Sequence, residues 1–155
     1  MRERIQQAMK DALKSGEKRR LSTLRLVTAA IKDRDIAARV DSKGKATGND
    51  RVSDDEILAL LQKMIKQRRE SVEIYTQGGR QELADQEADE IVIIEEFLPQ
   101  QMSEEEVREA TNATVEALGA TGLKDMGRVM AALKEKYTGQ MDFAKASSMV
   151  KEALK

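Results

Sequence analysis

The 155-residue chain contains no cysteine and no histidine, and these two absences remove most of the usual catalytic machinery. Without cysteine there is no disulfide, no thiol nucleophile and no zinc–thiolate site. Without histidine the commonest general base and transition-metal ligand are missing, so neither a Ser-His-Asp nor a Cys-His arrangement is possible. We therefore expect no catalytic residue, no cofactor and no metal. A cysteine-free chain also fits a reducing compartment, which predicts a cytoplasmic location.

Aromatic residues are equally scarce, and long apolar runs are absent. The four aromatic residues are Tyr75, Phe97, Tyr137 and Phe143. The core must therefore consist of aliphatic side chains and methionines, a composition suited to helix packing. No apolar run approaches the roughly 20 residues that span a bilayer. Residues 1–15 lack the apolar stretch of a secretory signal, so we expect no membrane partner.

Charge is balanced overall but unevenly distributed along the chain. The net charge is −1, yet residues 1–45 hold thirteen basic and six acidic residues, and residues 81–109 hold one basic and eleven acidic residues. Such segregation indicates oriented charged surfaces. The acidic stretch Glu82–Glu96 lacks calcium-loop spacing and histidine, so a solvated helix face is a better interpretation than a metal site.

The first two predicted helices cover residues 1–15 and 17–39, where apolar residues recur at helical spacing. Gly16 between them is a plausible helix stop. The second helix is heavily basic on its other faces, and it could contact phosphates or pair with the acidic fourth helix. Residues 41–51 contain two glycines and almost nothing apolar, which predicts a mobile loop.

A capping box, Ser53 with Glu56, begins the third and longest predicted helix. Gly78-Gly79 ends it, with one glycine expected in the left-handed conformation. The fourth predicted helix, residues 80–98, begins acidic and becomes apolar. Its run Ile91–Ile94 predicts a segment buried almost all round.

Pro99, the only proline, marks a boundary because it disfavours helix at the residue before it. Ser103 with Glu106 is a second capping box, which begins a fifth helix. Apolar periodicity predicts two further helices, residues 125–137 and a last one with Asp142 as N-cap.

No strand alternation is evident, so the predicted fold is all-α. We expect an N-terminal bundle of about four helices in residues 1–98. A small three-helix C-terminal domain is expected in residues 99–155.

The stretch 122–142 contains the most unusual local pattern. Gly127 lies in the first turn of a helix, where glycine costs up to about 1 kcal/mol relative to alanine. Glycine is useful where another backbone or a ligand approaches closely. Lys124 and Arg128 flank it, and a helix N-terminus favours phosphate. The pattern is compatible with a tight helix–helix contact and with a ligand contact.

Three stretches, residues 25–39 (RLVTAAIKDRDIAAR), 53–107 and 118–133 (LGATGLKDMGRVMAAL), together resemble the YqeY family. The resemblance covers nearly the whole chain in the correct order. It implies an N-terminal helical domain and a three-helix C-terminal domain similar to the tail of the GatB component of the glutamyl/aspartyl-tRNA amidotransferase. In that enzyme the tail contacts tRNA, while the chemistry takes place on other domains and subunits.

The resemblance implies a non-catalytic protein that binds tRNA or another RNA, or an accessory protein related to the amidotransferase. The candidate RNA-binding residues are Lys124, Gly127, Arg128, Lys134, Lys136 and Gly139. A secondary basic surface would comprise Arg19, Arg20, Arg25 and Lys32. The family often has a basic residue after Gly139, where this chain has Gln140. Because aromatic residues for stacking are few, any RNA contact would be to backbone and shape, and sensitive to salt.

Two alternatives remain open at the level of sequence. The chain could be a protein–protein adaptor that docks a partner through its acidic segment or its basic second helix. It could also participate in tRNA-dependent amidation, a carbon–nitrogen ligase activity with glutamine as amide donor, which only the resemblance implies. No small-molecule substrate is evident.

Overall fold

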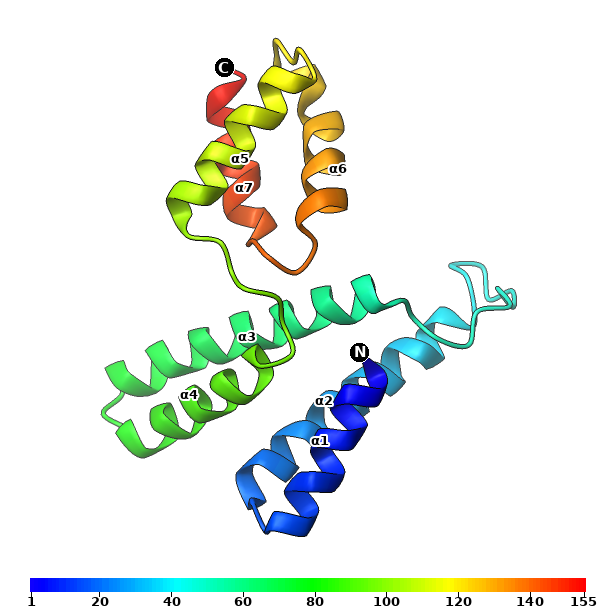
Figure 1. Cartoon of the computed structure of the whole chain (residues 1–155), viewed down its shortest axis with the longest axis vertical. Helices are drawn as coiled ribbons and strands as arrows, with labels where there is room; N and C mark the ends of the chain where they lie inside the picture. Colours follow the sequence, from blue (N-terminus) through cyan, green and yellow to red (C-terminus); the bar gives the residue numbers. More distant parts are fainter. The chain divides into compact units, whose positions relative to one another are not determined.

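The computed structural model describes residues 1–155, and its regular structure is helical (Figure 1). The helices are α1 (Arg2–Ser15), α2 (Lys18–Ala38), α3 (Asp54–Gln77), α4 (Gln81–Glu95), α5 (Glu104–Ala117), α6 (Met126–Tyr137) and α7 (Phe143–Ala153), with a 3₁₀ turn η1 (Leu123–Asp125) before α6. The prediction of an all-α fold is confirmed. None of these helices combines the length and the apolar character that crossing a bilayer requires.

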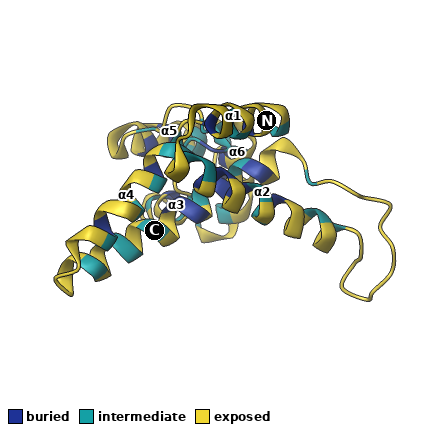
Figure 2. Ribbon diagram, turned by 90° about the horizontal axis from the view of Figure 1, so that it is seen from below, coloured by how far each residue is buried: buried dark blue, intermediate teal, exposed yellow.

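The chain divides into two compact units. Unit 1 is Met1–Leu98 and contains α1 to α4, and unit 2 is Pro99–Lys155 and contains α5 to α7. Each unit has its own hydrophobic core (Figure 2). The core of unit 1 is built around Leu24, Val27, Ile57, Leu61 and Ile94. The core of unit 2 is built around Val129, Leu133, Met141, Ala146 and Val150.

Helix ends follow the local signals in the sequence. In the capping box that begins α3, the Ser53 N–H donates to Glu56 Oε2 at 2.7 Å and the Glu56 N–H donates to Ser53 Oγ at 3.3 Å. Ser103 and Glu106 repeat this arrangement at α5. Gly79 follows α3 with φ 73°, the left-handed conformation that glycine adopts without steric cost.

The expectation that α4 is buried almost all round at Ile91–Ile94 is wrong. Ile91 and Ile94 are buried, but the side chain of Val92 is 61% exposed. The helix packs against α2 and α3. Because each residue turns about 100° around a helix axis, Val92 points away from the face that carries Ile91 and Ile94.

Residues 39–51, which we call the arm, begin with a hydrogen-bonded hairpin over residues 39–47. Val40 and Ala46 form an antiparallel bridge, the Asp41 N–H donates to the Lys45 carbonyl at 2.8 Å, and the Thr47 N–H donates to the Arg39 carbonyl at 2.9 Å. The sequence predicted only a mobile loop here. Its paired backbone gives the basic side chains of the arm a defined framework.

Candidate nucleic-acid interface

The four basic residues proposed for RNA contact in unit 2 are all exposed, at η1 and α6. Lys124 lies in η1, Arg128 in the first turn of α6, and Lys134 and Lys136 in its last turn. Lysines in the last turn of a helix also compensate the negative end of its dipole. The structure therefore places these cations at both ends of one helix.

Asp125 partly neutralises the cations at the N-terminal end of α6. Its carboxylate accepts a hydrogen bond from the Thr121 N–H at 3.0 Å, and Arg128 Nη2 lies 3.3 Å from its Oδ1. The Thr121 hydrogen bond is the main reason that the pKa of Asp125 is lowered, and the charges of Arg128 and Lys124 act in the same direction. Arg128 is thus an ion-paired residue, whereas Lys124 makes no ion pair.

Lys134 and Lys136 do not share a face of α6. Residues two positions apart are related by a rotation of about 200° around the helix axis, so these side chains leave the helix in nearly opposite directions. The Nζ of Lys136 lies 5.4 Å from the centre of the Tyr137 ring, within the range of a cation–π contact. A single flat ligand surface along α6 can contact one of these lysines but not both.

The two glycines of the predicted site have different environments. Gly127 is exposed, and a Cβ built on it would meet no atom within 4 Å. The tight helix–helix contact considered for this position is therefore absent, and the space above Gly127 is open. Gly139 is buried with φ 78°, and its carbonyl accepts a hydrogen bond from Gln101 Nε2 at 2.6 Å. It shapes the turn between α6 and α7 and offers no surface.

The secondary basic surface on α2 is partly consumed by ion pairs within unit 1. Arg19 Nη1 lies 2.7 Å from Asp89 Oδ2 of α4, and Arg20 Nη1 lies 2.6 Å from Glu96 Oε2 just beyond α4. The alternative of pairing with the acidic fourth helix therefore holds for the first turn of α2. Arg25 and Lys32, further along the helix, are exposed and make no ion pair.

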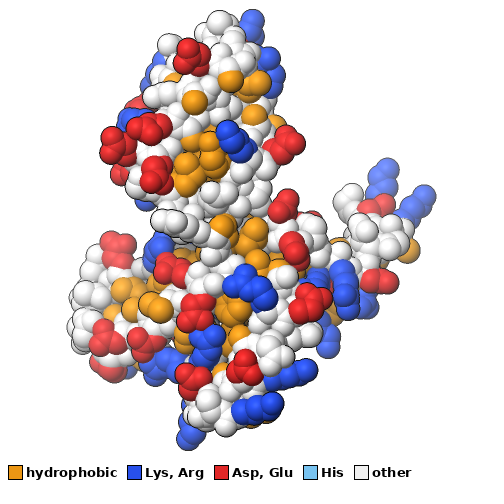
Figure 3. Space-filling view, in the orientation of Figure 1, with side chains coloured by type: hydrophobic (Ala, Val, Ile, Leu, Met, Phe, Trp, Pro, Cys, Tyr) orange, Lys and Arg blue, Asp and Glu red, His pale blue; other side chains and the backbone are white.

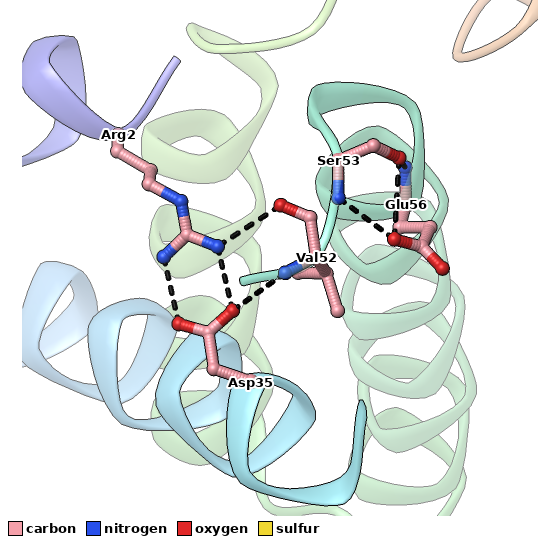
Figure 4. Close-up of polar contacts among 5 residues, drawn as sticks. All are labelled: Arg2, Asp35, Val52, Ser53 and Glu56. Atoms are coloured by element: carbon pink, nitrogen blue, oxygen red, sulfur yellow. Dashed lines mark hydrogen bonds and ion pairs between the residues drawn. The ribbon is translucent and has the colours of Figure 1, made fainter. Parts of the chain in front are cut away.

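A further arginine, Arg2, is held in a polar network that joins three segments of unit 1 (Figure 4). Its two Nη atoms donate to the two carboxylate oxygens of Asp35 at 2.7 and 2.6 Å, and Nη2 also donates to the Val52 carbonyl at 3.0 Å. The Val52 N–H in turn donates to Asp35 at 2.8 Å. Mainly because of the Arg2 hydrogen bond, the pKa of Asp35 is lowered to about 2.

Sequence reasoning did not select a second group of cations, at the C-terminal end of α2 and in the arm. Figure 3 shows Lys and Arg side chains gathered there. Arg34, Arg39, Lys43, Lys45 and Arg51 are all exposed and make no ion pair. The signal was present, because these five residues fall within 18 positions between residues 34 and 51, but the predicted mobile loop gave no reason to treat them as one surface.

The structure thus defines a helical protein of two compact units, with exposed cations in both and no cluster of acidic side chains able to hold a metal ion. The chain belongs to the YqeY family, because the family model described as Yqey-like protein matches residues 2–154. No curated protein matches the sequence.

Proposed function

We propose that the protein is a non-catalytic RNA-binding protein whose unit 2 contacts the phosphate backbone of tRNA or a similarly folded RNA. One observation carries the proposal. All six lysines of unit 2 are exposed, and none of them makes an ion pair with the nine acidic residues of the same unit. The lysines are Lys124, Lys134, Lys136, Lys145, Lys151 and Lys155.

Free lysines are suited to this role because they bind phosphate as mobile point charges. Each phosphate that a lysine neutralises releases condensed counterions, so affinity comes largely from electrostatics and falls steeply with salt. Unit 2 has only Tyr137 and Phe143 as aromatic residues, and both are half-buried, so stacking on unpaired bases contributes little. Recognition would then depend on backbone shape, as is usual for structured RNA.

The test is a filter-binding titration of the full chain with total tRNA over a series of KCl concentrations. We expect measurable affinity at low salt and a linear fall of log K with log salt concentration. Absence of binding even at the lowest salt would overturn the proposal.

Because Lys134 and Lys136 leave α6 in nearly opposite directions, single alanine variants identify the contacting face. The residue that touches phosphate should reduce the magnitude of the salt slope by about 1, and the other should leave it unchanged. Lys66→Ala, which removes an exposed and unpaired lysine of α3, is the matched control. Equal small effects of all three substitutions would mean general charge attraction rather than a defined contact.

A protein–protein adaptor is a second candidate, favoured by Val92 on α4. This exposed apolar side chain lies within the most acidic segment of the chain, which is where a basic partner with an apolar anchor would dock. The measurement is affinity capture from lysate treated with ribonuclease. A partner retained by the parent chain and lost with Val92→Ser would support the adaptor, and identical recovery with both chains would reject it.

Participation in tRNA-dependent amidation is a narrower form of the main proposal. If it holds, adding the protein to a purified amidotransferase raises the conversion of misacylated tRNA. Unchanged conversion would reject this form and leave RNA binding itself unaffected.

A further inference from the structure

Nine of the thirteen arginines of this protein contact a partner group, and three of the four exceptions lie in one part of unit 1. Unit 1 contains eleven arginines, and seven of them contact a carboxylate, a carbonyl or an aromatic ring: Arg2, Arg4, Arg19, Arg20, Arg68, Arg69 and Arg80. Both arginines of unit 2 are paired as well, Arg108 with Glu104 and Arg128 with Asp125. The other four form no ion pair, and three of them are Arg34, Arg39 and Arg51, at the end of α2 and in the arm, although the charge of Arg51 does act on Asp35.

The arm presents its cations on a built framework. Gly44, with φ 76°, makes the turn of the hairpin, and Lys43 and Lys45 lie on either side of it. Asp41 is the nearest acidic residue in sequence, but its Oδ1 accepts the backbone N–H groups of Lys43 and Lys45 at 2.8 and 2.9 Å. The carboxylate therefore holds the turn, and both ammonium groups remain without an ion pair. Figure 2 shows the arm as exposed and extended away from the helices of its unit.

A groove between α2 and α3 adjoins the base of the arm. Its volume is about 290 Å³, and its lining residues are Arg34, Val52, Glu56, Ala59, Leu60 and Lys63. Arg34 from α2 and Lys63 from α3 bring one unpaired cation from each helix. The one acidic residue, Glu56, accepts the Ser53 N–H in the capping box. The groove thus combines two available cations with an apolar lining and a carboxylate that already has a partner.

We propose that this surface of unit 1, made of Arg34, Arg39, Lys43, Lys45, Arg51 and Lys63, binds the sugar–phosphate backbone of RNA. The identity of the ligand rests on the proposed function, whereas the location of the site rests on the unpaired arginines. The planar guanidinium group binds phosphate through two parallel hydrogen bonds, which makes an arginine without a carboxylate partner the strongest phosphate ligand in the chain. By this criterion unit 1, and not unit 2, holds the stronger phosphate contacts.

The shape of the surface favours RNA over a membrane. A bilayer is flat and contacts what protrudes, so it would meet the tip of the arm but not Arg34 and Lys63 in the groove. A rounded polyanionic backbone can contact the groove and the arm together. The absence of tryptophan, and of any aromatic residue in the arm or groove, agrees with recognition of backbone rather than bases.

The experiment compares three multiple variants of the full chain, with total tRNA as the probe and filter binding over a KCl series as the measurement. The arm variant is Arg39→Gln/Lys43→Gln/Lys45→Gln, and the groove variant is Arg34→Gln/Lys63→Gln. The matched control is Lys10→Gln/Lys14→Gln, which removes two exposed and unpaired cations from α1, outside every basic surface considered for RNA contact. Circular dichroism confirms that each variant folds, which is expected because every substituted residue is exposed.

We expect the salt slope to fall by about 3 for the arm variant, by about 2 for the groove variant and not at all for the control. The arm variant should bind roughly tenfold or more weakly at the salt concentration of the cell. Arm and groove variants that bind like the parent chain would overturn this inference. If Lys134→Ala or Lys136→Ala still lowers the slope in that case, the proposed function of unit 2 stands.

Two further outcomes separate this inference from its competitors. Loss of binding in the arm variant without any effect of the unit 2 substitutions supports the unit 1 site and moves RNA recognition away from unit 2. The inference would be overturned in favour of a lipid surface by two results together. The parent chain would fail to bind tRNA but cosediment with vesicles containing phosphatidylserine, and the arm variant would lose that cosedimentation.

Discussion

The two units of the chain use their charged side chains in different ways. In unit 1, ion pairs connect different helices, as in Arg2–Asp35 between α1 and α2 and Arg68–Glu90 between α3 and α4. In unit 2 the only ion pairs are local, three or four residues apart in sequence. Unit 1 therefore uses part of its charge to fix the positions of its helices. Unit 2 relies on its apolar core and its caps, and the lysines of both units form no ion pair.

The two units also differ in how they treat a buried polar side chain, a threonine in each case. Thr23 of unit 1 and Thr111 of unit 2 are both buried, with 0% and 1% of their surface exposed. Thr23 Oγ1 donates to the Arg19 carbonyl at 2.8 Å, whereas Thr111 Oγ1 has no hydrogen-bond partner. Unit 1 thus satisfies its buried polar group, and unit 2 contains one that is unsatisfied.

The largest effect that tests this comparison is expected from Asp35→Asn. The substitution removes the carboxylate that accepts hydrogen bonds from both Nη atoms of Arg2. It leaves the half-buried guanidinium group without a negatively charged partner. We expect unit 1 to lose about 2 kcal/mol of stability, because hydrogen bonds to charged groups contribute roughly that much. Hydrogen exchange should show faster exchange in α1 to α3, with α5 to α7 unchanged. Asp33→Asn, at an exposed acid of the same helix without an ion pair, is the control, and an equal loss in both variants would contradict the role of the network.

The next effect concerns acid pH and the same carboxylate. The pKa of Asp35 is lowered from 3.8 to about 2 in the folded protein, chiefly by the Arg2 hydrogen bond, while burial acts in the opposite direction. A lowered pKa means that the contribution to stability is complete above about pH 4 and is lost as the pH falls through about 2. We therefore expect the midpoint of thermal unfolding, measured by circular dichroism, to decrease less between pH 4 and pH 2 for Asp35→Asn than for the parent. Parallel curves for the two proteins would show that Asp35 does not titrate with folding.

The smallest effect is expected at the buried threonines. Thr111→Val replaces an unsatisfied hydroxyl by a methyl group of similar size, so we expect unit 2 to gain about 1 kcal/mol. Thr23→Val removes a hydroxyl that has a partner, and it should bring no such gain. The measurement is the denaturant midpoint of each variant. A destabilised Thr111→Val protein would mean that the hydroxyl of Thr111 has a favourable interaction.

Features decided within a few residues could be predicted from the sequence. Both capping boxes and the left-handed glycine after α3 are present, because a serine with a glutamate three residues later and a Gly-Gly pair act through their immediate backbone. The exposure of Val92 could not be predicted, because a run of four apolar residues does not indicate which side of the helix faces its neighbours. That depends on packing between segments far apart in the chain.

The candidate site was less predictable than the fold, because partner choice depends on tertiary contacts. Arg19 and Arg25 look alike in the sequence, yet the first meets Asp89, seventy residues away, and the second meets no acid. The arm was missed for a related reason. The pairing of Val40 with Ala46 has almost no hydrophobic signal, so nothing in the sequence indicated that Lys43 and Lys45 share a framework with Arg39.

The distribution of the two tyrosines provides a spectroscopic means of observing each unit separately. Tyr75 lies in α3 of unit 1 and Tyr137 in α6 of unit 2, and the chain contains no tryptophan to mask their emission. A Tyr75→Phe protein would carry a single tyrosine, in unit 2, whose emission can be excited selectively over that of phenylalanine. Because the ammonium group of Lys136 lies beside the Tyr137 ring, an anion that binds Lys136 would alter the surroundings of that fluorophore directly. The same protein could therefore report the unfolding of unit 2 and the occupation of one of its proposed contacts without any attached label.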